Sequence, residues 1–180
     1  MKNIRLNHIY KIENASLDND MLKIEGYAAH YNKTNLNDEV VDAKSFDTFF
    51  SMYNAKQITP RLSWEHTDTI IGGIDEIVSK TNGLWITAHL NNNVKIVNEM
   101  IAPNVLAGDL DSLSSEGYVL NGIDGIVNNS DGSYYVRDFL LTAVSVVRTP
   151  ADPEAKFTVK NFVEEWKEEH KPIRKIYWFV

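Results

Sequence analysis

Cysteine is absent from the sequence, and this absence removes several kinds of site at once. Disulfide scaffolds, thiolate zinc sites, iron–sulfur clusters and cysteine nucleophiles all depend on the cysteine sulfur. A nucleophile in this chain must therefore be a serine, a threonine, a lysine, a carboxylate or a metal-bound water.

Long hydrophobic runs and a basic charge balance are missing as well. No segment approaches the roughly 20 apolar residues that a membrane-spanning helix needs, and the polar residues 1–7 contain no apolar core of a signal peptide. Lysine and arginine number 18 against 25 acidic residues, which gives a formal charge of −7. We therefore expect an intracellular protein that binds neither a membrane nor nucleic acid, since a nucleic-acid-binding surface would be basic.

The residues that are present predict one folded domain of α+β class. The chain has 180 residues, of which 43% are hydrophobic and 11% aromatic, and this is enough to bury a core. Seven or eight short strands separated by turn residues, without β-α-β alternation, predict a mostly antiparallel sheet or barrel with a few short helices. The longest expected strand spans residues 134–147, and Pro103 is expected to end a helix that carries Val94, Val97 and Ile101.

A change of character near residue 157 predicts two regions, a barrel domain over residues 1–156 and a C-terminal region over residues 157–180. In the second region, Val159, Phe162, Val163 and Trp166 fall on one face of a helix, and the last eight residues, IRKIYWFV, form an apolar tail. The tail either packs on the body of the protein or adds to a sheet of a partner.

His66 is the histidine whose context most favours chemistry. It follows the apolar segment Leu62-Ser63-Trp64 and precedes the strand that begins near Ile70, so it lies at a strand end or bend, where a rigid element can present an imidazole. His66 and Asp68 could begin a metal site, but no further ligand lies at a matching short spacing. We expect no metal and no other cofactor.

The run Ser112-Leu113-Ser114-Ser115-Glu116-Gly117-Tyr118 is the second notable feature. Small hydroxyl residues before a glycine are often turn residues, and the run lacks the strand–turn–helix context of a nucleophile elbow. A serine on a strand needs a base to take its proton, and His66 is the best candidate. A third segment, residues 140–153, ends in Arg148 and two prolines, and Arg148 could help to stabilise an oxyanion.

Six segments in a fixed order resemble the prohead (capsid maturation) proteases of tailed phages, whose fold is similar to that of the herpesvirus assembly proteases. Residues 25–29 resemble the family's opening G-Y/F-A strand, and residues 113–118 resemble its S-x-G-F/Y strand. The other segments are residues 43–46, 62–72, 83–84 and 144–155. The resemblance covers about residues 23–155 and implies a herpesvirus-protease-like α+β barrel.

The resemblance implies that Ser115 is the nucleophile and His66 the general base of a serine endopeptidase. Ser114 is the neighbouring alternative, and on a strand the two serines point to opposite faces. The family usually has an acidic third residue where this chain has Ala143. Three interpretations follow: a Ser–His dyad, a relocated acid among Asp138, Asp68 and Glu65, or an impaired enzyme. Asp138 would need a β-bulge to face the right way.

The implied function is cleavage of scaffold and major capsid protein segments, and of the protease itself, inside the assembling prohead in the host cytoplasm. The herpesvirus enzymes also suggest a homodimer. An alternative is an inactive, protease-like assembly factor that binds scaffold or capsid protein without cleaving it. A third interpretation, which makes no use of the resemblance, is a small antiparallel barrel that binds a ligand or peptide.

Overall fold

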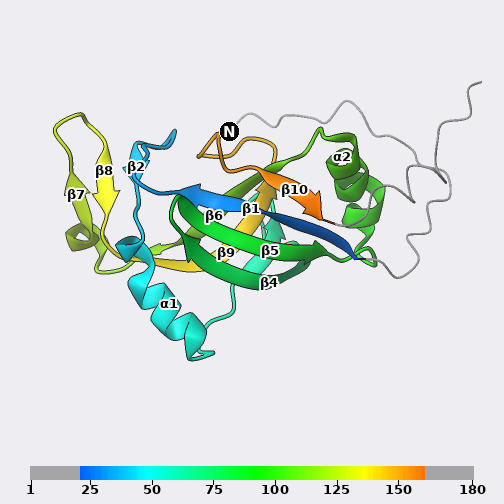
Figure 1. Ribbon diagram of the computed structural model, residues 1–180, viewed down its shortest axis with the longest axis horizontal. Helices are drawn as coiled ribbons and strands as arrows, with labels where there is room; N and C mark the ends of the chain where they lie inside the picture. The colour runs from blue at the N-terminus through cyan, green and yellow to red at the C-terminus, as the bar shows by residue number, and fades with distance from the viewer. Residues whose placement is uncertain (1–20, 161–180) are drawn as a thin grey trace, which may run out of the picture.

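The computed structural model describes residues 21–160, which form ten strands and a few short helical segments (Figure 1). The strands are β1 (Leu22–His30), β2 (Glu39–Val40), β3 (Arg61–Trp64), β4 (Ile70–Lys80), β5 (Gly83–Leu90), β6 (Ser112–Val119), β7 (Ile126–Asn128), β8 (Tyr134–Val136), β9 (Phe139–Val147) and β10 (Phe157–Lys160). The helices are α1 (Asp47–Asn54) and α2 (Ala102–Ala107), with short helical turns at Lys44–Phe46, Val97–Ile101 and Gly122–Gly125.

Seven strands form one curled sheet in the order β10-β1-β5-β4-β3-β9-β6, and β2, β8 and β7 form a second, small sheet. All neighbours in the large sheet are antiparallel except β3 and β9, which run parallel. The sheet curls until its two edges meet at one end, where Ser112 of β6 bridges to Lys156 and the Leu113 N–H donates to the Ala155 carbonyl at 2.8 Å. This half-barrel with short helices confirms the expected α+β class.

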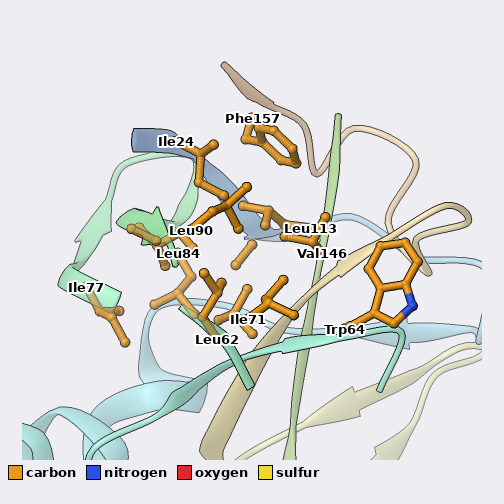
Figure 2. Packing of buried hydrophobic residues seen from close by; sticks show 14 of the residues in the cluster. Ile24, Leu62, Trp64, Ile71, Ile77, Leu84, Leu90, Leu113, Val146 and Phe157 are labelled. Carbon is orange, nitrogen blue, oxygen red and sulfur yellow. The ribbon is translucent and has the colours of Figure 1, made fainter. Parts of the chain in front are cut away.

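The core lies on the inner face of the curled sheet. Along β1 the buried Leu22 and Ile24 alternate with the exposed Lys23, which is the two-residue period of a strand with one face inward. Every strand of the large sheet contributes side chains to this core. Figure 2 shows Ile24, Leu62, Ile71, Leu84, Leu113, Val146 and Phe157 converging there. Burial of this cluster fixes which face of each strand points outward, and so determines which polar side chains reach the surface.

Three expectations about elements differ from the structure. Pro103 does not end a helix but lies in the first turn of α2, directly after the π-helical turn Val97–Ile101, where the regular α-helical hydrogen-bond pattern is already interrupted. The segment 134–147 is two strands in different sheets, β8 and β9. Phe157–Lys160 is strand β10, paired with β1, because the edge of β1 offers free backbone groups and Phe157 enters the core. The rest of the expected C-terminal helix and the apolar tail lie outside the described residues.

Within residues 21–160, no helix has the length and apolar character that crossing a membrane requires.

Candidate active site

His66 lies in a tight turn between β3 and β4. The Trp64 carbonyl accepts a hydrogen bond from the Thr67 N–H at 2.9 Å, and the two central residues, Glu65 and His66, have φ angles of 49° and 56°. Two positive φ values in succession are those of a type I′ turn, which normally selects Asn-Gly. For residues other than glycine this backbone costs about 1–2 kcal/mol each, so the surrounding structure has to hold the turn in place.

The end of β9 supplies the contacts that hold this turn. The Glu65 N–H donates to the Val146 carbonyl at 3.1 Å, and the His66 N–H donates to Ser145 Oγ at 3.1 Å. Arg148 donates to Glu65 Oε1 from its backbone N–H at 3.0 Å and from Nε at 2.6 Å. The sequence suggested that Arg148 could help to stabilise an oxyanion, but in the structure its side chain binds the turn. Arg148 is not among the described residues that line the nearby cavity, which is described next.

Strand register places the two candidate serines on β6. Ser114 lies opposite Ser145 of β9, Ser115 opposite Val144 and Glu116 opposite Ala143. Opposite residues of an antiparallel pair share a face, so Ser114 and Glu116 lie on the face of Ser145, and Ser115 lies on the face of Val144. Ser114 is 6% exposed, whereas Ser115 is half-buried.

A cavity of about 340 Å³ brings these residues together. It opens where β6 and β1 separate, and residues from the small sheet and from the loop after β1 complete its wall. Ser114, Ser115, Glu116 and His66 all line it. No hydrogen bond in the described part of the chain joins either serine hydroxyl to the His66 ring, so the imidazole and the two hydroxyls line one cavity without being bonded to each other.

The His66 ring contacts a carboxylate that the sequence analysis did not consider. Nδ1 of His66 lies 3.0 Å from Oε2 of Glu116, and the side chains are 44% and 34% exposed. Carboxylate oxygens only accept hydrogen bonds, so this contact places a proton on Nδ1. One feature of the sequence could have identified Glu116, namely its position directly after Ser115. The register of β6 against β9 would then have placed its side chain opposite Ala143.

The three carboxylates proposed from sequence have other partners. Glu65 binds Arg148, and Asp68, which is 99% exposed, lies 3.4 Å from Arg61. Asp138 accepts a hydrogen bond from Thr48 Oγ1 at 3.0 Å. A register shift does occur in β9, between the partners of Glu116 and Gly117, but Asp138 lies before that strand begins.

A second histidine–carboxylate pair lies on another part of the cavity wall. Nδ1 of His30 lies 2.7 Å from Asp152 Oδ2, which also accepts the His30 backbone N–H at 2.8 Å. The apolar part of the wall consists of Ala28, Ala29, Val41, Phe46, Val136, Phe139 and Ala151. The cavity thus combines an apolar wall with two imidazoles and three hydroxyls, those of Thr34, Ser114 and Ser115, a mixed composition typical of ligand-binding pockets.

Hydrogen bonding also fixes a carboxylate at the rim of the cavity. The Tyr134 hydroxyl donates to Glu39 Oε1 at 3.0 Å, and Glu39 lines the cavity. Burial, together with this hydrogen bond and the charge of Glu39, raises the pKa of Tyr134 to about 12. The phenol therefore stays protonated and keeps Glu39 in position over the whole physiological range.

Comparisons with known proteins bear on the family and the fold of the chain. A family model described as caudovirus prohead serine protease matches residues 10–169. The capsid assembly protease gp21 of bacteriophage T4 is 19% identical, over 72% of this chain and 84% of that chain, with a TM-score of 0.56. The KSHV protease is 11% identical over 83% and 69% of the two chains, with a TM-score of 0.48. The varicella-zoster virus protease is 11% identical over 79% and 65%, with a TM-score of 0.47. No curated protein sequence matches.

Proposed function

The chain belongs to the caudovirus prohead serine protease family, and we propose that its reaction takes place in the cavity between β6 and β1, with Ser115 as nucleophile and His66 as general base. The observation that carries this proposal is that both serines and His66 line one cavity, although the His66 turn and the serines of β6 lie about 50 residues apart in the sequence.

The chemistry follows from the hydrogen bond on the imidazole. With a proton on Nδ1, the Nε2 lone pair of His66 is free to take the Ser115 hydroxyl proton as Ser115 Oγ attacks a peptide carbonyl. The imidazolium then returns that proton to the leaving amine as the C–N bond breaks, which leaves an acyl-enzyme. Water, deprotonated by the same imidazole, releases the acyl group and restores the serine.

Different observations favour Ser115 and Ser114 as the nucleophile. The half-buried Ser115 is open to a substrate in the cavity and occupies the nucleophile position of the family motif. Ser114 lies on the face of Glu116 and Ser145, the side to which the His66 turn is bound. We assign the nucleophile to Ser115 because a substrate must reach it, and we treat Ser114 as the alternative that experiment must exclude.

Labelling with a fluorophosphonate probe, which reacts with activated serines, separates these assignments. We expect Ser115→Ala and His66→Ala to abolish labelling, and Ser114→Ala and the exposed Ser51→Ala on α1 to retain it. Co-expression with the major capsid protein should show the same pattern of cleavage. Loss of labelling in Ser114→Ala alone would transfer the role to Ser114. A folded wild-type protein that neither labels nor cleaves would instead be a protease-like assembly factor.

The proposal extends to partners and place. The substrates are segments of the major capsid protein or scaffold, and cleavage occurs within the prohead. We also propose a homodimer, which sedimentation analysis of the purified chain would test directly.

A further inference from the structure

We propose that Glu116 is the positioning residue for His66, and that it acts from β6 in place of an acidic side chain at position 143 of β9. This inference rests on the proposed role of His66, and it identifies the residue that orients the imidazole. The residue is not catalytic in the strict sense, because its carboxylate touches the base and not the reacting atoms.

The strand register explains how one position substitutes for the other. Glu116 and Ala143 are direct partners in the antiparallel pair of β6 and β9. The Cβ atoms of such partners lie about 4.5–5.5 Å apart on the same face. A carboxylate on either residue therefore reaches the same region above the sheet, and the small Ala143, which is fully buried, leaves that region to the Glu116 side chain.

The contacts of the two side chains fit a positioning role. His66 is the hydrogen-bond partner of the Glu116 carboxylate, whereas the backbone N–H of His66 is bound independently by Ser145. The backbone contact fixes the position of the His66 main chain. The carboxylate fixes the orientation of the imidazole ring and determines which ring nitrogen carries the proton. Without Glu116, the imidazole at this half-exposed site would be free to rotate and to exchange between its two tautomers.

Exchanging the two residues provides a sharp test. We expect Glu116→Ala to lower the second-order rate constant of fluorophosphonate labelling about 100-fold. This is less than the loss of about 10⁴-fold seen when the buried third residue of a triad is replaced, because Glu116 and His66 are partly exposed. The double variant Glu116→Ala/Ala143→Glu, which keeps the same composition, should recover at least tenfold of that loss. Glu116→Asp should retain more activity than Glu116→Ala. A Glu116→Ala rate within threefold of the wild type would overturn the proposal.

A spectroscopic measurement tests the same contact without turnover. In ¹⁵N-labelled protein, neutral His66 should be largely the Nδ1–H tautomer in the wild type and a mixture in Glu116→Ala. The matched control is Asp75→Ala, which removes the carboxylate 2.6 Å from Nδ1 of His89, outside the cavity; it should change His89 and leave His66 and the labelling rate unaltered.

The two readouts distinguish failure of this inference from failure of the proposed function. If the His66 tautomer differs between the wild type and Glu116→Ala, but the wild type never labels, the role of Glu116 is supported and the Ser115 assignment is rejected. An unchanged tautomer in Glu116→Ala would reject the role of Glu116 even if labelling is normal. If the exchange variant does not fold, because a glutamate at the buried position 143 is too costly, the tautomer of the single variant decides.

Discussion

At the scale of single residues, the geometry of the base depends on a serine that performs no chemistry. Ser145 is fully buried, and its Oγ accepts the His66 N–H at 3.1 Å and lies 2.8 Å from Ser63 Oγ. It is the central member of a row of three serines across β3, β9 and β6. The hydroxyl at position 145 thus connects the sheet to a turn whose backbone is intrinsically unfavourable.

Ser145→Ala should destabilise the fold by about 1–3 kcal/mol, because it leaves the buried Ser63 hydroxyl and the His66 N–H without this partner. The labelling rate should fall about tenfold as the turn loosens. The double variant Ser63→Ala/Ser145→Ala should recover part of the stability, since removing both hydroxyls leaves fewer unpaired groups, but it should recover none of the rate. Chemical denaturation and labelling kinetics measure the two effects.

The control for Ser145 is Ser112→Ala. Ser112 is similarly buried and binds Asp111 and Lys156, away from the cavity wall. The Ser112→Ala variant should therefore be less stable than the wild type but should keep its labelling rate. Equal rate losses in the Ser112 and Ser145 variants would mean that general destabilisation, and not the position of His66, sets the rate.

Some residues of the candidate site could be predicted from the sequence and others could not. The sequence identified His66 and the serine run, because each has a local context that favours chemistry. It did not identify Glu116, because a contact across strands depends on register, and a slip of one residue would have turned Glu116 to the other face. The acids considered from sequence were chosen by local or motif position, and the structure gives each of them another partner.

At the scale of elements, Gly117 sets the path of β6 beside the site. A Cβ built at this position would lie 2.1 Å from the Leu140 carbonyl oxygen of β9, and the register of the two strands shifts between Glu116 and Gly117. Only glycine lets the strands approach this closely at the irregularity. The glycine of the S-x-G-Y motif is therefore explained by a backbone contact with the neighbouring strand.

Gly117→Ala should push β6 away from β9 and displace Ser115 and Glu116, so both stability and the labelling rate should fall, the rate by at least tenfold. Gly108→Ala is the comparison. Gly108 follows α2 with a φ of 80° and open space around it, so an alanine there costs about 1 kcal/mol of backbone strain and should leave the rate unchanged. A normal labelling rate in Gly117→Ala would show that β6 tolerates the shift.

The limits of prediction at this scale come from long-range pairing. Alternating apolar and polar residues predicted seven or eight short strands, and the described part of the chain has ten. The separation of β8 from β9 and the strand nature of β10 were missed, because they depend on which edges are free in the folded sheet. Local preferences do not contain that information.

At the scale of the whole molecule, the cavity exists because the sheet closes at one end and not at the other. The contacts of Ser112, Leu113 and Asp111 with residues 155–157 join the two edges, while the small sheet borders the open end. Tyr134 and Glu39 belong to the parallel pair β8–β2 of that small sheet, so its integrity and the shape of the cavity rim are linked.

Alkaline pH should weaken the molecule partly through Tyr134. The pKa of its phenol is about 12 in the fold and about 10 in an unfolded chain, so between pH 10 and 12 the unfolded chain releases a proton that the fold retains. Stability is therefore complete below pH 10 and declines as the pH rises towards 12. Denaturation curves of the wild type and Tyr134→Phe should converge across this window. A constant difference between them from pH 9 to 12 would contradict the assignment.

The residues that hold the His66 turn come late in the sequence, and this affects when during synthesis the site can form. Every residue to which we assign a part in the chemistry lies before position 120, yet the groups that hold the turn lie at positions 145–148. A ribosome-bound or truncated chain that ends before β9 would contain His66, Ser115 and Glu116 but nothing to hold the strained turn. Under the proposed assignment, synthesis order alone therefore delays proteolysis until β9 has been made.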